Sequence, residues 1–275
     1  MKPLDRPEVS FTISKLSMPV TKSVVVLAKP DVGDPEQVVI KINDPRYLDE
    51  RIETPPSPFP SYPWMFANEH AAAMARGSQS SELSDEELMD KIDSDNPKYL
   101  SVEDLATHYL LLEESFYRLM MECYDAELKA YERLKHLQGS VIPRLIMAGQ
   151  FLPPDERAIQ PPALVLEYIP SVSLYDVPST AITPAISAQL VSAIESFPSY
   201  GVIHSDLTST NIHFTPPEQP VRVVVIDFGC CMIRAKEDEG YWTACGAADV
   251  RLARRLLKDQ NIRRLIPDEC VSRFR

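Results

Sequence analysis

Three oxygen-bearing side chains, Asp206, Asn211 and Asp227, occupy positions where reactive groups often gather. The first two belong to the stretch H-S-D-L-T-S-T-N, which is typical of a short loop between apolar segments. Asp227 directly follows the apolar run at residues 223–226, which is typical of a buried strand. Because loops and strand ends present side chains to ligands, this pattern predicts that the three groups belong to one site.

The residue types suggest what that site would do. Carboxylate and amide oxygens are the ligands that Mg²⁺ prefers, and transfer of the γ-phosphoryl group of ATP requires positioning and charge neutralisation more than covalent help. We therefore expect Asn211 and Asp227 to hold Mg²⁺, and Asp206 to orient an acceptor hydroxyl and take its proton. The alternative is that these side chains only cap turns.

Composition limits the class of protein. A chain of 275 residues with 44% hydrophobic content can bury a core as one two-lobed domain or two small domains. The net charge of -12 argues against nucleic acid or anionic membranes as default partners. A basic cluster at residues 251–264 is either a solvated helix face or a local binding site.

Cysteine use and the N-terminus favour an intracellular protein, cytoplasmic or nuclear. The five cysteines are odd in number and include no C-x-x-C pair, which is typical of a reducing compartment. The first residues, MKPLDRPEVS, contain no apolar signal-peptide core, and no stretch approaches the length of a membrane span.

The N-terminal part predicts a three-stranded sheet at residues 9–16, 23–28 and 37–42. Lys41 lies within the apolar third strand, where burying an ammonium group is costly unless it meets an anion. The alternative is a strand lysine that faces solvent.

Residues 44–100 are typical of an insertion. A Pro-rich segment indicates extended, polyproline-like backbone, and Ser84-Asp85-Glu86-Glu87 is a capping box that predicts a helix through Ile92. We expect a partly flexible decoration, and docking of a protein partner on the Pro-rich segment is an alternative role.

A long helix is predicted from Ser101 to Leu137, either continuous or with one break. Ser101 can cap its start, and Gly139 can end it. Its apolar stripe places Glu127 toward the core, where a carboxylate requires a cation, and Lys41 is the candidate. If the stripe drifts around the helix, Glu127 is solvated instead.

The later elements complete the expected fold. Strands are predicted at residues 141–146 and 162–169, followed by a helix that Thr183 and Pro184 open and that ends near Pro198. A final helix is predicted at residues 247–257, with Asp249 in its first turn.

Several of these segments resemble kinases. H-x-D-x-x-x-x-N followed by I-D-F-G resembles the kinase catalytic and metal-binding motifs, V-V-I-K resembles the strand whose lysine grips phosphates, and L-V-L-E-Y-I-P resembles the kinase hinge. Together with D-A-E-L-K-A-Y-E-R-L-K-H-L-Q-G-S-V-I-P-R-L, these segments are similar to the fungal protein-kinase-like proteins, which lie between protein kinases and aminoglycoside phosphotransferases. The resemblance covers nearly the whole chain and is strongest at residues 120–232.

The resemblance implies an α+β, bilobal protein-kinase-like fold. Residues 1–169 would form an N-lobe with an antiparallel sheet and a long helix, and residues 170–275 a reduced, mainly helical C-lobe. The implied activity is ATP- and Mg²⁺-dependent transfer of a phosphoryl group to a hydroxyl of a small molecule or protein.

The same resemblance implies roles for single residues. Lys41 would bind the phosphates of ATP and Glu127 would position it, while backbone groups near Glu167 and Ile169 would contact the adenine edge. Asp206 would act as the base. Asn211 and Asp227 would hold the metal, and Asp249 would brace the catalytic loop.

Departures from protein kinases leave two other functions open. The first hairpin, residues 15–22, has no glycine, Ser205 stands where many protein kinases have arginine, and no A-P-E follows D-F-G. Control by phosphorylation of the segment that follows D-F-G is therefore not expected. The alternatives are a pseudokinase that senses nucleotide or acts as a scaffold, and an interaction protein that binds no nucleotide.

Overall fold

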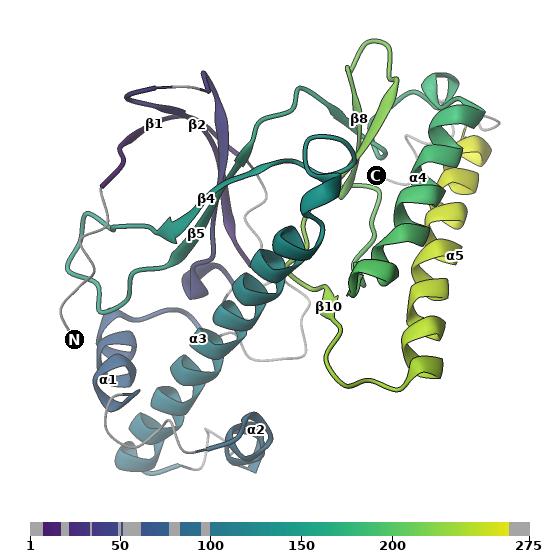
Figure 1. Cartoon of the computed structure of the whole chain (residues 1–275). Helices are drawn as coiled ribbons and strands as arrows, with labels where there is room; N and C mark the ends of the chain where they lie inside the picture. Colours follow the sequence, from purple (N-terminus) through teal and green to yellow (C-terminus); the bar gives the residue numbers. More distant parts are fainter. Residues whose placement is uncertain are drawn as a thin grey trace. The chain divides into compact units, whose positions relative to one another are not determined.

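The computed structural model describes residues 8–17, 22–33, 35–48, 51, 62–76, 83–94 and 100–263 (Figure 1). The chain divides into two compact units. The first comprises Met1–Tyr124 and Met147–Val165, and the second comprises Asp125–Ile146 and Leu166–Arg275. The fold is α+β, as expected, with an antiparallel sheet of five strands in its N-terminal part.

The five-stranded sheet contains the three strands predicted near the N-terminus. These are β1 (Phe11–Leu16), β2 (Val24–Pro30) and β3 (Val38–Ile42), which pair antiparallel in sequence order. The sheet continues with β5 (Pro162–Glu167) and β4 (Leu145–Gln150), in the order β1-β2-β3-β5-β4.

Alternating β-branched residues give the sheet its core face. Val38, Ile40 and Ile42 of β3 pack with Val26 of β2 and Val165 of β5. Lys41 lies between these core positions and is itself only 7% exposed. The alternative of a solvent-facing strand lysine is therefore wrong, and Lys41 is buried as expected.

The described part of the insertion is held to the first unit by buried ion pairs. It contains the 3-10 helix η1 (Pro45–Tyr47) and helices α1 (Phe66–Arg76) and α2 (Asp85–Ser94). The two α-helices lie beside the first part of α3 (Val102–Arg133) in Figure 1. Arg51 forms a bidentate pair with Glu113 of α3, at 3.0 and 2.6 Å, and Arg76 of α1 contacts Glu114 at 2.8 Å. These described segments are an integral part of the unit. The prolines at positions 55, 56, 58 and 60 lie outside the described residues.

A second ionic cluster centres on Arg157, whose side chain is fully buried. Its guanidinium contacts Asp44 at 2.8 and 3.2 Å and Glu69 of α1 at 2.5 and 3.2 Å. Trp64 donates its indole N–H to the same glutamate at 2.9 Å. One cation from the segment between β4 and β5 therefore joins the end of β3 to the insertion.

Local capping signals are confirmed where they were predicted. Ser84 and Glu87 form the reciprocal bonds of a capping box at the start of α2. Ser101 accepts from the amide of Asp104 at the start of α3, which then runs without a break. The helix ends at Arg133, and η5 (Lys135–Leu137) leads to Gly139, whose φ of 74° suits glycine.

The second unit combines two small sheets with two long helices. Strands β6 (Val172–Ser173), β8 (Ile212–Thr215) and β9 (Arg222–Val225) form one sheet, and β7 (Val202–Ile203) pairs with β10 (Met232–Ile233). Helices α4 (Pro184–Ser196) and α5 (Glu239–Arg263) pack side by side (Figure 1). Short 3-10 helices, η6 (Ser179–Ala181) and η7 (Phe197–Tyr200), flank α4, and Thr183 caps it as predicted.

Two predicted boundaries are wrong. The strand expected at residues 141–146 is β4, which begins only at Leu145, because residues 138–142 form a tight turn closed by the bond from the Gly139 amide to the Ile142 carbonyl. The last helix begins at Glu239 instead of Ala247. Asp238 accepts from the amides of Gly240 and Tyr241, and this cap starts the helix earlier.

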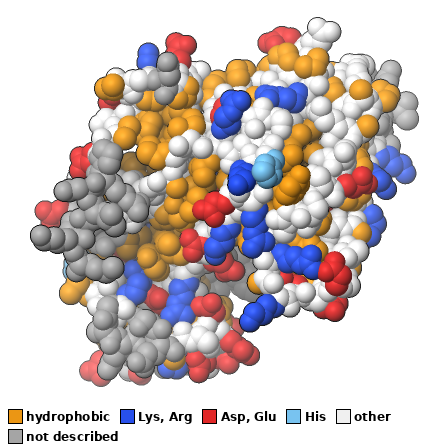
Figure 2. Space-filling model, viewed as in Figure 1, with side chains coloured by type: hydrophobic (Ala, Val, Ile, Leu, Met, Phe, Trp, Pro, Cys, Tyr) orange, Lys and Arg blue, Asp and Glu red, His pale blue; other side chains and the backbone are white. Residues whose placement is uncertain are grey.

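The surface carries both signs of charge. On the face shown in Figure 2, basic and acidic side chains are intermingled among apolar ones, without a continuous field of one sign. Within the described part of the chain, no helix combines the length and the apolar composition that crossing a membrane requires.

We predict that Arg157→Met lowers the free energy of unfolding by about 3–5 kcal/mol, because it leaves Asp44 and Glu69 buried without their shared cation. Urea denaturation measures the change. Arg254→Met is the matched control, since Arg254 pairs with Glu195 at the surface and its loss should cost less than about 1 kcal/mol. Equal effects of the two substitutions would contradict a stabilising role of the buried cluster.

The same cluster predicts acid sensitivity. Burial raises the pKa of Asp44, but bonds from Arg46 and Arg157 outweigh it, so that the pKa lies below its ordinary value of 3.8. The folded state thus favours the ionised form, and the resulting stability is present above the unfolded pKa and lost as pH falls below it. Urea midpoints measured from pH 6 to pH 3 should fall more steeply for the wild type than for Asp44→Asn. Parallel curves would exclude this contribution.

Candidate functional site

The loop between β7 and β8 is anchored by His204, which is fully buried. Its Nε2 lies 3.0 Å from the carbonyl oxygen of Ile226, and its Nδ1 lies 3.3 Å from the amide nitrogen of Asp206. Because the amide can only donate, Nδ1 accepts and Nε2 carries the proton. Burial lowers the pKa of His204, which keeps the ring neutral. The imidazole thereby ties Asp206 to the residue that precedes Asp227.

Asn211 makes the second connection between the loop and the end of β9. Its side-chain amide donates to the carbonyl oxygen of Asp206 at 3.0 Å, and its backbone carbonyl accepts from the amide of Ile226 at 3.0 Å. The Nδ2 bond fixes the plane of the amide group, which leaves Oδ1 as the atom for a ligand. Asp206, Asn211 and the backbone leading to Asp227 are thus brought together, as predicted from their order in the sequence.

Two residues of this region adopt backbone conformations that side chains other than glycine rarely take. Ser205 has φ of 61° and Asp227 has φ of 65°. Such conformations cost about 1 kcal/mol or more each and persist where the surroundings hold them. For Ser205 the support is visible: Asp249 of α5 accepts from its amide at 3.1 Å.

Asp249 is the brace that the sequence suggested, although it lies further inside α5 than the first turn. Burial raises its pKa, and the bond from the Ser205 amide opposes that effect. Helix α5 therefore supports the strained turn immediately before Asp206.

The segment Asp227-Phe228-Gly229 is held by aromatic packing. The buried ring of Phe228 contacts His204, Tyr131 and Phe197, with centroid distances of 4.8, 5.8 and 5.8 Å. Asp227 accepts from the amide of Gly229 at 3.4 Å. Through Phe228, this aromatic cluster joins the last part of α3, η7 and the loop between β7 and β8.

Glu127 takes part in the same arrangement. It is 0% exposed, so the interpretation of a solvated glutamate is wrong, and its Oε1 accepts from the amide of Phe228 at 3.4 Å. Sequence reasoning placed Glu127 toward the core but did not foresee this contact. The four-residue spacing between Glu127 and Tyr131 puts both on one helix face, and this spacing was the sequence signal that both could contact the same segment.

The hinge candidates lie at the end of β5. Glu167 binds Arg144 through its side chain, and its amide donates to the carbonyl of Arg144 at 2.9 Å. Ile169 is partly exposed. Contacts to an adenine edge would therefore use groups other than the amide of Glu167.

Lys41 belongs to the first unit, whereas Glu127, Asp206, Asn211 and Asp227 belong to the second. Hydrogen bonds join the loop of Asp206 and Asn211 to Ile226, and Glu127 to Phe228. Ile226 and Phe228 are the chain neighbours of Asp227. Within the described residues, no three His, Cys, Asp or Glu side chains gather as a ready metal cage. One carboxylate and one amide oxygen nevertheless fit Mg²⁺, which usually keeps waters and takes its remaining ligands from nucleotide phosphates.

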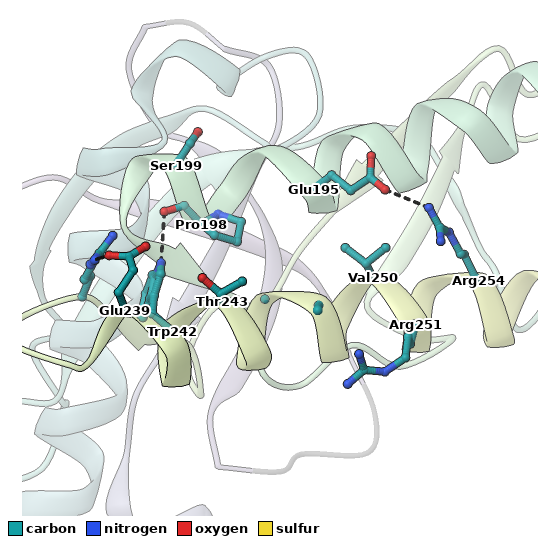
Figure 3. A pocket seen from close by; sticks show the side chains of 12 residues that line it. Glu195, Pro198, Ser199, Glu239, Trp242, Thr243, Val250, Arg251 and Arg254 are labelled. Atoms are coloured by element: carbon teal, nitrogen blue, oxygen red, sulfur yellow. Dashed lines mark hydrogen bonds and ion pairs between the residues drawn. The ribbon is translucent and has the colours of Figure 1, made fainter.

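A separate groove of about 590 Å³ lies between α4 and α5 (Figure 3). It contains none of the residues predicted to bind nucleotide or metal, but Arg251 and Arg254 of the basic cluster line it. Trp242 closes one side by donating to the Pro198 carbonyl, and Arg254 pairs with Glu195 at 2.8 Å. Arg255 pairs loosely with Asp259 at 3.8 Å. These surface pairs favour a solvated helix face as the explanation of Arg254 and Arg255. The side chains of Arg263 and Arg264 lie outside the described residues.

Comparisons with known proteins give fold-level likeness only. No family model and no curated protein matches the sequence. Among solved structures, the Rio2 kinase from Chaetomium thermophilum is 14% identical, with a TM-score of 0.49 over 90% of this chain and 58% of that one. The Rio2 kinase-ADP/Mg²⁺-phosphoaspartate complex from the same organism is 15% identical, with a TM-score of 0.46 over 93% and 56%. The chain thus spans somewhat more than half the length of each, and residue roles rest on the geometry above.

We predict that Asp249→Ala raises the hydrogen-exchange rate of the Ser205 amide by about tenfold or more, because the strained turn loses its acceptor. Asp249→Asn, which retains a carbonyl oxygen, should have a smaller effect. The matched control is Asp259→Ala, an exposed residue of the same helix. Unchanged exchange in Asp249→Ala would show that the turn does not depend on this bond.

Proposed function

We propose that the chain is an ATP- and Mg²⁺-dependent phosphotransferase of the kinase-like superfamily. The observation that carries this proposal is the hydrogen-bonded arrangement in which His204 and Asn211 join the loop of Asp206 to the end of the strand before Asp227. Phosphoryl transfer requires such a rigid placement of a metal ligand set and a base.

The roles follow from chemistry and exposure. Asn211, held by its side-chain nitrogen, offers Oδ1 to Mg²⁺, and the carboxylate of Asp227 is the second ligand. Asp206 is only partly buried, so an acceptor hydroxyl can reach its carboxylate, which orients the nucleophile and takes its proton. Bound Mg²⁺ would neutralise charge on the transferred phosphoryl group.

The remaining candidates would bind the rest of the nucleotide. Lys41 of β3 is suited to the phosphates, because its ammonium group is a positive charge that can bind phosphate oxygens. Glu127 would position Lys41, and backbone groups near Glu167 and Ile169 would contact adenine. The acceptor is a hydroxyl of a small molecule or a protein. We further propose membership of the fungal protein-kinase-like group and an intracellular location, on the resemblance and cysteine use given above.

A pseudokinase that binds nucleotide or acts as a scaffold is the second candidate. The observation in its favour is the first hairpin, residues 15–22, which lacks the glycines that let backbone amides approach phosphates closely. Such a protein would bind nucleotide without transferring the phosphoryl group.

The test is a thermal-shift titration with ATP, with and without Mg²⁺. At a ligand concentration of about 100 times Kd, the wild type should gain about 2.7 kcal/mol of stability when Mg²⁺ is present and much less when it is absent. Asp227→Ala should lose this gain, whereas the control Asp155→Ala, which removes an exposed carboxylate elsewhere, should keep it.

Asp206→Asn separates the two candidates. For a phosphotransferase it should retain Mg²⁺-ATP binding and lose about 10²-fold or more of the rate of ATP turnover. Equal and negligible turnover in the wild type and Asp206→Asn, despite binding, favours the pseudokinase. No stabilisation of the wild type at millimolar ATP and Mg²⁺ overturns both.

A further inference from the structure

The hydroxyl group of Tyr131 lies in an unusual environment. Tyr131 is 0% exposed on α3, one turn after Glu127, and its hydroxyl oxygen makes no hydrogen bond with any residue that the structure describes. Buried polar groups of proteins are almost always hydrogen-bonded, and the exceptions call for an explanation such as a role at a site or a bound water.

The neighbours of Tyr131 belong to the candidate metal site. Its ring packs edge-on against Phe228, with centroids 5.8 Å apart and an angle of 69° between the planes. Phe228 directly follows Asp227, and its amide donates to Glu127. The phenol is therefore held between a helix that carries one carboxylate and a segment that carries another.

The phenol can only act as a neutral donor there. Burial raises its pKa well above the ordinary value, and the negative charges of Glu127 and Asp227 raise it further. A neutral O–H group near two carboxylates has acceptors of the right kind. A phenylalanine would fill the same space without leaving a polar atom in the core.

We propose that Tyr131 is a positioning residue for the Mg²⁺ site: with nucleotide and cation bound, its hydroxyl donates to the carboxylate of Asp227, directly or through one buried water. The bond fixes which carboxylate oxygen faces the cation. The bond from Gly229 to Asp227, at 3.4 Å, is long and leaves room for such a constraint. Partners that orient a metal ligand commonly affect metal affinity without contacting the metal.

The inference rests on the proposed function, and Tyr131→Phe tests it. The apparent Kd for Mg²⁺ is measured at a fixed ATP concentration by thermal shift, along with ATP binding in the absence of Mg²⁺. Loss of the hydroxyl should weaken Mg²⁺ binding by about tenfold or more, leave Mg²⁺-free nucleotide binding unchanged, and be rescued by excess Mg²⁺.

Tyr200→Phe is the matched control, because this tyrosine also belongs to the second unit but is 38% exposed. It should leave the Mg²⁺ dependence as in the wild type. Tyr131→Leu, which removes the hydroxyl and changes the shape of the side chain, should weaken Mg²⁺ binding at least as much as Tyr131→Phe.

Two failures are distinguishable. If the wild type binds ATP in a Mg²⁺-dependent manner and Tyr131→Phe has the same Mg²⁺ dependence, the positioning role is wrong and the proposed function stands. A higher melting temperature of Tyr131→Phe in all ligand states would then identify the hydroxyl as an unsatisfied core group. If the wild type shows no Mg²⁺-dependent binding, the proposed function fails and this inference fails with it.

Discussion

The candidate site depends on one buried, neutral imidazole. His204 accepts from the Asp206 amide on one side and donates to the Ile226 carbonyl on the other. A charged ring would have two donors and could not accept from that amide, so burial of His204 selects the protonation state that the loop requires. The aromatic ring of Phe228 packs against the imidazole, with centroids 4.8 Å apart. The packing of the core around His204 therefore also determines where the loop of Asp206 lies.

Much of the framework could be predicted because its signals are local. Each helix start that was predicted correctly is marked by a cap within a few residues along the chain. The caps are Ser84 for α2, Ser101 for α3 and Thr183 for α4. Apolar periodicity likewise predicted that Glu127 would face the core, and the order of the loop and strand motifs predicted that Asp206 and Asn211 would lie beside the strand end before Asp227. Each of these inferences needs only neighbours along the chain.

The parts that were missed depend on residues distant in sequence. Arg157 lies in an unremarkable loop sequence, and nothing near it shows that Asp44 and Glu69 will meet its guanidinium. The left-handed backbone at Ser205 and Asp227 cannot be predicted from residue type, because only a few per cent of residues other than glycine adopt it, even though aspartate does so more often than most. The early start of α5 was hidden by Gly240 and Gly246, which lower helix propensity, while buried Trp242 and the Asp238 cap outweigh them.

The ionic attachment of the insertion has a consequence for behaviour at elevated temperature. Removing charges from water becomes less costly on heating, because the hydration free energy of ions becomes less favourable as temperature rises. The stabilisation from burying apolar surface increases little over the same range. Segments held by Arg51 and Arg157 should therefore loosen relatively late in a thermal transition, compared with segments held only by apolar contacts. The charged cluster thus holds the described part of the insertion in place on heating, although its composition predicted a partly flexible segment.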